Sequence, residues 1–126
     1  MKTSVKPQKN WIGKHIASYK YAMQGIWFAF KNESNMSFHM VAAVGVILTN
    51  YFIQISRTEW LITLIMTGLV FMAEVFNTAL EKLADRVSQE HDPLIGQVKD
   101  LASGAVLIIC FVAVVVALIV YVPYLV

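Results

Sequence analysis

Three long apolar segments limit what this chain can fold into. They predict transmembrane helices at residues 38–55, 60–80 and 101–122, because each is near the roughly 20 residues that a helix needs to cross a bilayer core of about 30 Å. Of the 126 residues, 58% are hydrophobic and only 14% are charged, a composition too apolar for a soluble globular domain. We therefore expect one all-α integral membrane domain that comprises residues 1–126.

A further helix is expected before the first apolar segment. Large apolar side chains recur at steps of three and four over residues 11–31, while lysine and glutamine side chains occupy the other faces. This pattern predicts an amphipathic helix that lies in the membrane interface, with its tryptophan and tyrosine rings at headgroup level. The polar residues that follow predict a turn, with Ser37 as the N-cap of the first transmembrane helix.

Basic residues are distributed unequally between the two sides of the apolar segments. Before the first segment and between the second and third they are Lys2, Lys6, Lys9, Lys14, Lys20, Lys31, Lys82, Arg86 and Lys99. The turn between the first and second segments carries only Arg57. By the positive-inside rule the N-terminus and the loop at 82–100 are cytoplasmic and the C-terminus lies outside, as in a multi-pass protein of the cytoplasmic membrane. The basic residues also suit anionic lipids, and nothing in the sequence indicates binding to nucleic acid.

The segment EVFNTALEKLAD, residues 74–85, adds carboxylates to the end of the second apolar segment. Glu74 lies inside that segment, where a charged side chain costs roughly 2.5–3.5 kcal/mol. At 100° per residue, Glu74, Glu81 and Asp85 lie within about 40° of one another, and Asn77 is about 60° away. The pattern predicts one polar stripe that runs from inside the bilayer to its cytoplasmic surface. A purely structural stripe is the alternative, with a neutral Glu74 and with Asp85 paired to an adjacent basic side chain.

The residue types in this region favour phosphoryl transfer. Glu33 is expected at the same membrane boundary as Glu81, and two carboxylates with phosphate oxygens suit Mg²⁺. Lys99 would bind phosphate as a point charge, and Glu74, about 10 Å deeper at 1.5 Å per residue, would face a lipid hydroxyl. No GxxxxGK[ST] loop or kinase glycine-rich loop occurs, which excludes the common nucleotide-binding folds.

A non-enzymatic membrane subunit that relays protons or binds cations through the same carboxylates is the alternative from another class. The pair Lys99 and Asp100, with the acidic loop at residues 90–92, favours the enzyme, because a proton path needs no cytoplasmic nucleotide site. Cys110, the single cysteine, lies in an apolar run and is expected to pack or to contact lipid.

At these residues the sequence resembles the prokaryotic diacylglycerol kinase family of small membrane lipid kinases. The segments that carry the resemblance are YAMQGIWFAFKNE at 21–33, AEVFNTALEKLADR at 73–86 and EHDPLIGQVKDLASGAVL at 90–107. The resemblance implies that Glu74 is the catalytic base for the lipid hydroxyl, with Asn77 beside it in the active site. It also implies ATP as phosphoryl donor, and Mg²⁺ held by Glu33 and Glu81, which also bind the ATP phosphates.

Further positions match nucleotide-binding residues of that family. These are Lys14, Tyr21, Glu90, His91, Asp92, Lys99 and Asp100. Lys14 stands where the family has arginine, and the loop at 90–92 differs in its second and third residues.

The resemblance further implies a homotrimer whose active sites are shared between subunits. The Gram-positive members, which phosphorylate undecaprenol, resemble the chain more closely through ISRTEW, EHDP and NESNMSFH. Undecaprenol and diacylglycerol both present a primary alcohol, so residue spacing does not decide between them.

Overall fold

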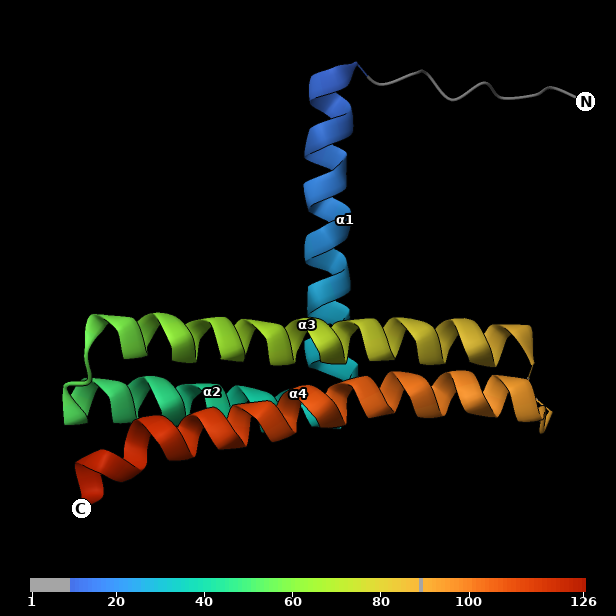
Figure 1. Ribbon diagram of the computed structural model, residues 1–126. Helices are drawn as coiled ribbons and strands as arrows, with labels where there is room; N and C mark the ends of the chain where they lie inside the picture. The colour runs from blue at the N-terminus through green and yellow to red at the C-terminus, as the bar shows by residue number, and fades with distance from the viewer. Residues whose placement is uncertain (1–9, 89) are drawn as a thin grey trace, which may run out of the picture. The chain divides into compact units, whose positions relative to one another are not determined.

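A computed structural model describes residues 10–88 and 90–126, and Lys2, Lys6 and Lys9 of the orientation prediction lie outside the described residues. The described chain is entirely helical apart from its turns and ends (Figure 1), with helices α1 Trp11–Asn32, α2 Ser34–Ile53, α3 Arg57–Val87 and α4 Pro93–Leu125. Three of them, α2, α3 and α4, are long and apolar enough to cross a membrane. This confirms the predicted all-α membrane class with three spans.

The chain divides into two compact units after Asn32. The first contains α1, a helix of 22 residues where the sequence predicted one at 11–31. Asn10 caps it, because its side-chain oxygen accepts a hydrogen bond from the Gly13 amide at 2.8 Å. The second unit contains α2, α3 and α4.

Helix α2 starts earlier than the sequence predicted. Glu33 alone has an extended conformation, and Ser34 already begins the helix, so the prediction of Ser37 as N-cap is wrong. The extra turn allows Asn35 to donate a hydrogen bond to Glu74 of α3. A tertiary contact of this kind overrides the local turn preference of a polar segment.

Two tight connections set the directions of the three helices. Gln54 takes the left-handed conformation at the end of α2, with φ 57°. Ser56 and Glu59 then form a capping box at the start of α3, with Glu59 Oε2 accepting from the Ser56 amide at 2.9 Å. At the other end, Asp92 accepts from the Leu94 amide at 2.9 Å and caps α4. Lys99 and Asp100 therefore lie in the second turn of α4, which begins before the predicted segment at 101–122.

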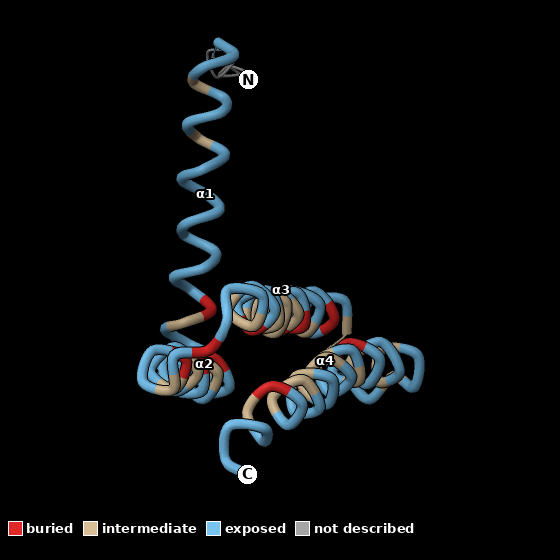
Figure 2. The backbone as a smooth tube through the Cα atoms, turned by 60° about the vertical axis from the view of Figure 1, so that its left-hand side comes forward, coloured by how far each residue is buried: buried red, intermediate tan, exposed pale blue. Residues whose placement is uncertain are grey.

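Helices α2, α3 and α4 lie side by side (Figures 1 and 2), and polar contacts join neighbouring helices. The interhelical pairs include Asn35–Glu74 and Asn50–Thr63 between α2 and α3, and Lys99–Asp85 and Tyr124–Glu59 between α3 and α4. Both pairs of neighbouring helices are antiparallel and keep one register along their length. Glu74, Asn50 and Thr63 are buried at the contacts between α2 and α3, while many large apolar side chains face outward. This distribution is that of a membrane protein.

Candidate active site

Glu74 lies on the inner face of α3 and is 2% exposed. Two side chains of α2 contact its carboxylate: Asn35 Nδ2 donates to Oε1 at 3.4 Å, and His39 Nε2 is 3.5 Å from Oε2. A buried carboxylate is stable only when it is paired or hydrogen-bonded. The two α2 side chains therefore offset the free-energy cost of burying the Glu74 carboxylate. The sequence prediction named Glu74 but missed these partners. Their spacing of four residues, which places both on one helix face, was the available signal.

Asn77 and Glu81 continue the polar stripe along α3 toward its C-terminal end. Asn77 Nδ2 donates to Glu81 Oε1 at 3.4 Å, and Asn77 is itself buried. Within the described residues, Asn77 Oδ1 and the Thr78 hydroxyl are buried with no hydrogen-bond partner. Buried polar atoms without partners are rare in native proteins and indicate a missing ion, water or ligand. The polar side chains of this stretch of α3 are therefore poised to bind a further group.

Glu33 lies at the N-terminal end of α2, half-buried, and its side chain makes no capping hydrogen bond. Asn35 is level with Glu74, and α2 and α3 are antiparallel. Glu33 consequently lies about 3 Å closer to the Glu81 end of the stripe, at 1.5 Å per residue. The structure thus places Glu33 at a depth between those of Glu74 and Glu81.

The donor set of this region can be tested for a magnesium ion. In the described ranges no three His, Cys, Asp or Glu side chains come close enough to hold a metal by themselves. Magnesium in phosphoryl-transfer sites usually takes one or two carboxylates and completes its shell with phosphate oxygens and water. Glu81 and the unpaired Asn77 Oδ1 are neighbouring oxygen donors of this kind on α3, and Glu33 stays a predicted third donor from α2. They fit a magnesium–phosphate group better than a metal site built from protein ligands alone.

A second polar group lies at the turn between α3 and α4. Lys99 of α4 forms an ion pair with Asp85 of α3, a contact that the sequence did not predict. A hollow of about 470 Å³ lies there, and its lining residues are Asp85, Ser88, Glu90, His91, Asp92, Ile95, Gly96 and Lys99. The structure therefore brings the predicted loop residues together with Lys99. Asp100, the next residue, is exposed.

This hollow is distant from the buried carboxylate. Asp85 follows Glu74 by three turns of α3, which is about 16 Å along the helix axis. Lys14 and Tyr21 are both exposed on α1, and their contact with ATP stays a prediction.

Comparison with known proteins identifies the family. The model of the family described as prokaryotic diacylglycerol kinase matches residues 20–121, and an undecaprenol kinase of Bacillus subtilis is 32% identical over 94% of this chain and 96% of its own length. The chain belongs to the prokaryotic diacylglycerol kinase family. Diacylglycerol kinases of Haemophilus influenzae and Escherichia coli are 34% and 29% identical over 79% of this chain, and the matches cover 86% and 82% of those relatives. These findings confirm the resemblance, and by class the chain is a membrane lipid kinase.

Proposed function

We propose that this kinase transfers the γ-phosphoryl group of ATP, with Mg²⁺, to the primary alcohol of undecaprenol. The observation that carries the proposal is the buried carboxylate of Glu74, which lies within a helix long and apolar enough to cross a membrane and is followed along α3 by Asn77 and Glu81. A carboxylate within a membrane-spanning helix can contact the hydroxyl group of a lipid alcohol. The hollow at the α3–α4 turn is lined in part by Lys99, whose charge suits the phosphates of a nucleotide.

In the proposed reaction, Glu74 acts on the lipid hydroxyl, and the residues toward the α3–α4 turn bind the nucleotide. Glu74 accepts the hydroxyl proton while the alcohol oxygen forms a bond to the γ-phosphorus. The bond from that phosphorus to the oxygen bridging the β-phosphate breaks, and ADP leaves. Asn35 and His39 orient the carboxylate, and Lys99 offsets charge on the nucleotide. Mg²⁺, held by Glu33 and Glu81, would neutralise charge on the phosphate oxygens.

The choice of undecaprenol rests on the relatives. The relative named undecaprenol kinase matches 94% of the chain, whereas the relatives named diacylglycerol kinase in Haemophilus influenzae and Escherichia coli match 79%. Diacylglycerol is the alternative acceptor and requires no change in the chemistry. A competition assay in micelles that contain both lipids separates the two, because the preferred acceptor has the larger kcat/KM.

We also propose how the kinase sits in the membrane. Residues 1–126 act as one kinase domain, with α1 in the cytoplasmic interface. Exposed rings along α1, including Trp11, Tyr19 and Trp27, support this position. The basic residues of α1 and of the α3–α4 turn support a cytoplasmic N-terminus and an external C-terminus. The assembly proposed is a homotrimer with shared sites.

The first test is phosphorylation of a lipid by the purified protein. Micelles that contain ATP, Mg²⁺ and either undecaprenol or diacylglycerol should give a phosphorylated lipid that thin-layer chromatography resolves. If neither lipid were phosphorylated by a folded protein, the proposal would be wrong.

The second test removes the proposed base. Glu74→Gln is nearly isosteric but cannot accept the proton, so kcat should fall by about 10²–10⁴-fold while ATP binding is retained. Glu59→Gln is a matched control, because Glu59 lies on the same helix at its opposite end. Retention of most of the wild-type kcat by Glu74→Gln would refute the role of Glu74.

A further inference from the structure

Thr78 is a buried polar residue of α3 to which the proposed reaction gives no role. It is 5% exposed, and within the described residues its hydroxyl has no hydrogen-bond partner. Burial of such a group lowers stability, so each case in a native protein needs a physical explanation. We propose that the Thr78 hydroxyl donates a hydrogen bond to the phosphoryl group while that group is transferred to the alcohol. This inference rests on the proposed function, since it takes Glu74 as the group that contacts the alcohol.

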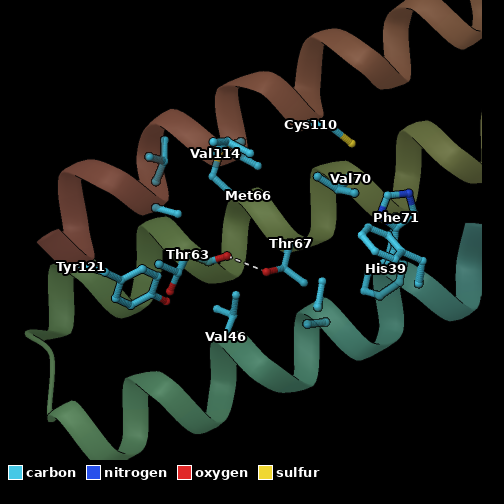
Figure 3. A pocket seen from close by; sticks show the side chains of 16 residues that line it. His39, Val46, Thr63, Met66, Thr67, Val70, Phe71, Cys110, Val114 and Tyr121 are labelled. Atoms are coloured by element: carbon cyan, nitrogen blue, oxygen red, sulfur yellow. Dashed lines mark hydrogen bonds between the residues drawn. The ribbon is translucent and has the colours of Figure 1, made fainter.

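Two other threonine hydroxyls of α3 are satisfied within the helix. Thr63 donates to the Glu59 carbonyl at 2.9 Å, and Thr67 donates to the Thr63 carbonyl at 2.8 Å (Figure 3). Each of these bonds joins a threonine to the carbonyl four residues earlier, a common partner for a threonine inside a helix. For Thr78 that carbonyl belongs to Glu74, and Thr78 donates neither to it nor to any other described residue. The Thr78 hydroxyl is therefore available to a ligand.

Thr78 lies on α3 between the residues proposed to contact the two substrates. It is four residues beyond Glu74 and three before Glu81, which is about 6 Å and about 4.5 Å along the helix axis. At 100° per residue, Thr78 is about 40° to one side of Glu74, and Asn77 is about 60° to the other side. Asn77 and Thr78 consequently lie on either side of the line from Glu81 to Glu74. A phosphoryl group that leaves a nucleotide near Glu81 for an alcohol at Glu74 passes between them.

The Thr78 hydroxyl supplies a donor among groups that accept hydrogen bonds. Asn77 Nδ2 already donates to Glu81 Oε1 at 3.4 Å, and the unpaired Asn77 Oδ1 is an acceptor. The carboxylates of Glu74 and Glu81 are acceptors as well. During transfer, negative charge is spread over three oxygens of the phosphoryl group, and a donor that is already in position stabilises this charge. The Thr78 proton stays on the threonine, so no bond of the threonine breaks.

Thr78 can be reached from the α3–α4 turn. Asn35 is level with Glu74 and the two helices are antiparallel, so Ser34, the first residue of α2, is level with Val75. Thr78 lies about 4.5 Å beyond that level, at 1.5 Å per residue. A phosphate that approaches along α3 from the turn therefore reaches Thr78 without separating α2 from α3.

The first test removes the hydroxyl and keeps the shape of the side chain. Thr78→Val should lower kcat for the lipid roughly 10–100-fold, the loss expected for one hydrogen bond to a charged group, with little change in KM for ATP. Thr78→Ser keeps the hydroxyl and should retain most of the wild-type kcat. Thr78→Ala should show the same loss as Thr78→Val if valine disturbs the packing. Thr49→Val is the matched control, because the Thr49 hydroxyl donates to the Gly45 carbonyl of its own helix at 2.7 Å.

Two further measurements distinguish a role in transfer from a structural role. The free energy of unfolding of Thr78→Val should equal or exceed that of the wild type, because the hydroxyl bonds to no described residue. ADP with Mg²⁺ and aluminium fluoride imitates the phosphoryl group during transfer. Its binding, followed as a rise in Tm, should weaken about tenfold in Thr78→Val, while binding of ADP alone stays unchanged.

The outcomes separate this proposal from the proposed function. Weaker binding of ADP–aluminium fluoride to Thr78→Val would support the role of Thr78 even if neither lipid were phosphorylated, a result that would refute the proposed function alone. If the wild type phosphorylates a lipid and Thr78→Val keeps the wild-type kcat, Thr78 has no part in the transfer and the proposed function stands. A loss of stability in Thr78→Val with unchanged binding of ADP–aluminium fluoride would assign the hydroxyl a structural role and overturn the proposal.

Discussion

At the scale of single residues, the carboxylate of Glu74 is held by α2 through both of its oxygens. Asn35 contacts Oε1 and His39 contacts Oε2. Each carboxylate oxygen has a second lone-pair direction, so these contacts leave room for a proton from a substrate hydroxyl. The two α2 side chains thus restrict the rotation of the carboxylate without blocking it.

Removal of the His39 side chain should therefore impair the chemical step. His39 Nε2 is 3.5 Å from the carboxylate, and loss of a contact with a charged group should cost about 1.5 kcal/mol, which corresponds to a fall in kcat of roughly tenfold for His39→Ala. KM for ATP should not change, because His39 lies at the opposite end of the stripe from the α3–α4 turn. Steady-state kinetics on micellar lipid measures both constants.

Two variants of α2 make this result specific. His39→Gln keeps an N–H donor and should recover part of the lost kcat. Ser37→Ala alters an exposed neighbour on the same helix and should leave kcat unchanged. An unaltered kcat in His39→Ala would show that the contact with Glu74 has no part in the reaction.

The residues of the site differ in how far the sequence could predict them. Glu74, Asn77 and Glu81 follow one another on one helix, so helical periodicity alone aligned them. The contacts of Asn35 and His39 with Glu74, and of Lys99 with Asp85, depend on the register between helices. That register is fixed by packing of whole helix faces and cannot be derived from the spacing along one segment.

At the scale of the helices, one buried polar cluster joins α2, α3 and α4 near the α2–α3 turn. Asn50 is fully buried, donates to Thr63 at 2.9 Å and accepts from the Tyr121 hydroxyl at 2.5 Å.

The positions of the three helices were predictable from apolar segment length. The N-terminal bounds of α2 and α4 were not, because the extended backbone at Glu33 and the capping hydrogen bonds of Asp92 are local features that hydropathy does not record.

The cluster should contribute moderately to stability. Interhelical hydrogen bonds in membranes are worth about 0.6 kcal/mol on average and up to about 1.7 kcal/mol, so Tyr121→Phe should lower the free energy of unfolding by an amount in that range. Thr49→Ala is the control, because the Thr49 hydroxyl donates to Gly45 of its own helix and joins no second helix. Unfolding in mixed micelles, followed by circular dichroism, measures both. Equal stability of Tyr121→Phe and the wild type would contradict a stabilising role.

The ion pair between α3 and α4 should behave differently. The side chains of Lys99 and Asp85 are 40% and 63% exposed, and exposed pairs are worth at most about 1 kcal/mol. Asp85→Asn should therefore hardly change the unfolding free energy, whereas it should raise KM for ATP because Lys99 loses the partner that positions it. Titration of initial rates with ATP tests this, with Arg86→Gln, a neighbouring exposed residue, as control. A large loss of stability without a change in KM would assign the pair a structural role.

At the scale of the whole molecule, the distance between the two polar groups bears on how many chains form one site. Lys99 is paired with Asp85, about 16 Å along α3 from Glu74, which is far for groups that act on one phosphoryl transfer. In a site composed of Glu74 from one copy and Lys99 from another, the two side chains could lie closer together than they do within one chain. Exposed apolar side chains on all three spanning helices leave surface for contacts between copies.

Mixing two inactive variants tests such sharing. Glu74→Gln and Lys99→Met should each be inactive alone. If the proposed trimers form from equal amounts of both variants and cyclic neighbours share each site, about one site in four receives intact Glu74 and Lys99. About a quarter of the wild-type activity should then return. Mixing either variant with Glu59→Gln serves as the control for assembly, because Glu59→Gln keeps both residues. If the two inactive variants stay inactive after mixing, while each still assembles with the control, both residues act within one chain and the separation along α3 must be bridged by the nucleotide.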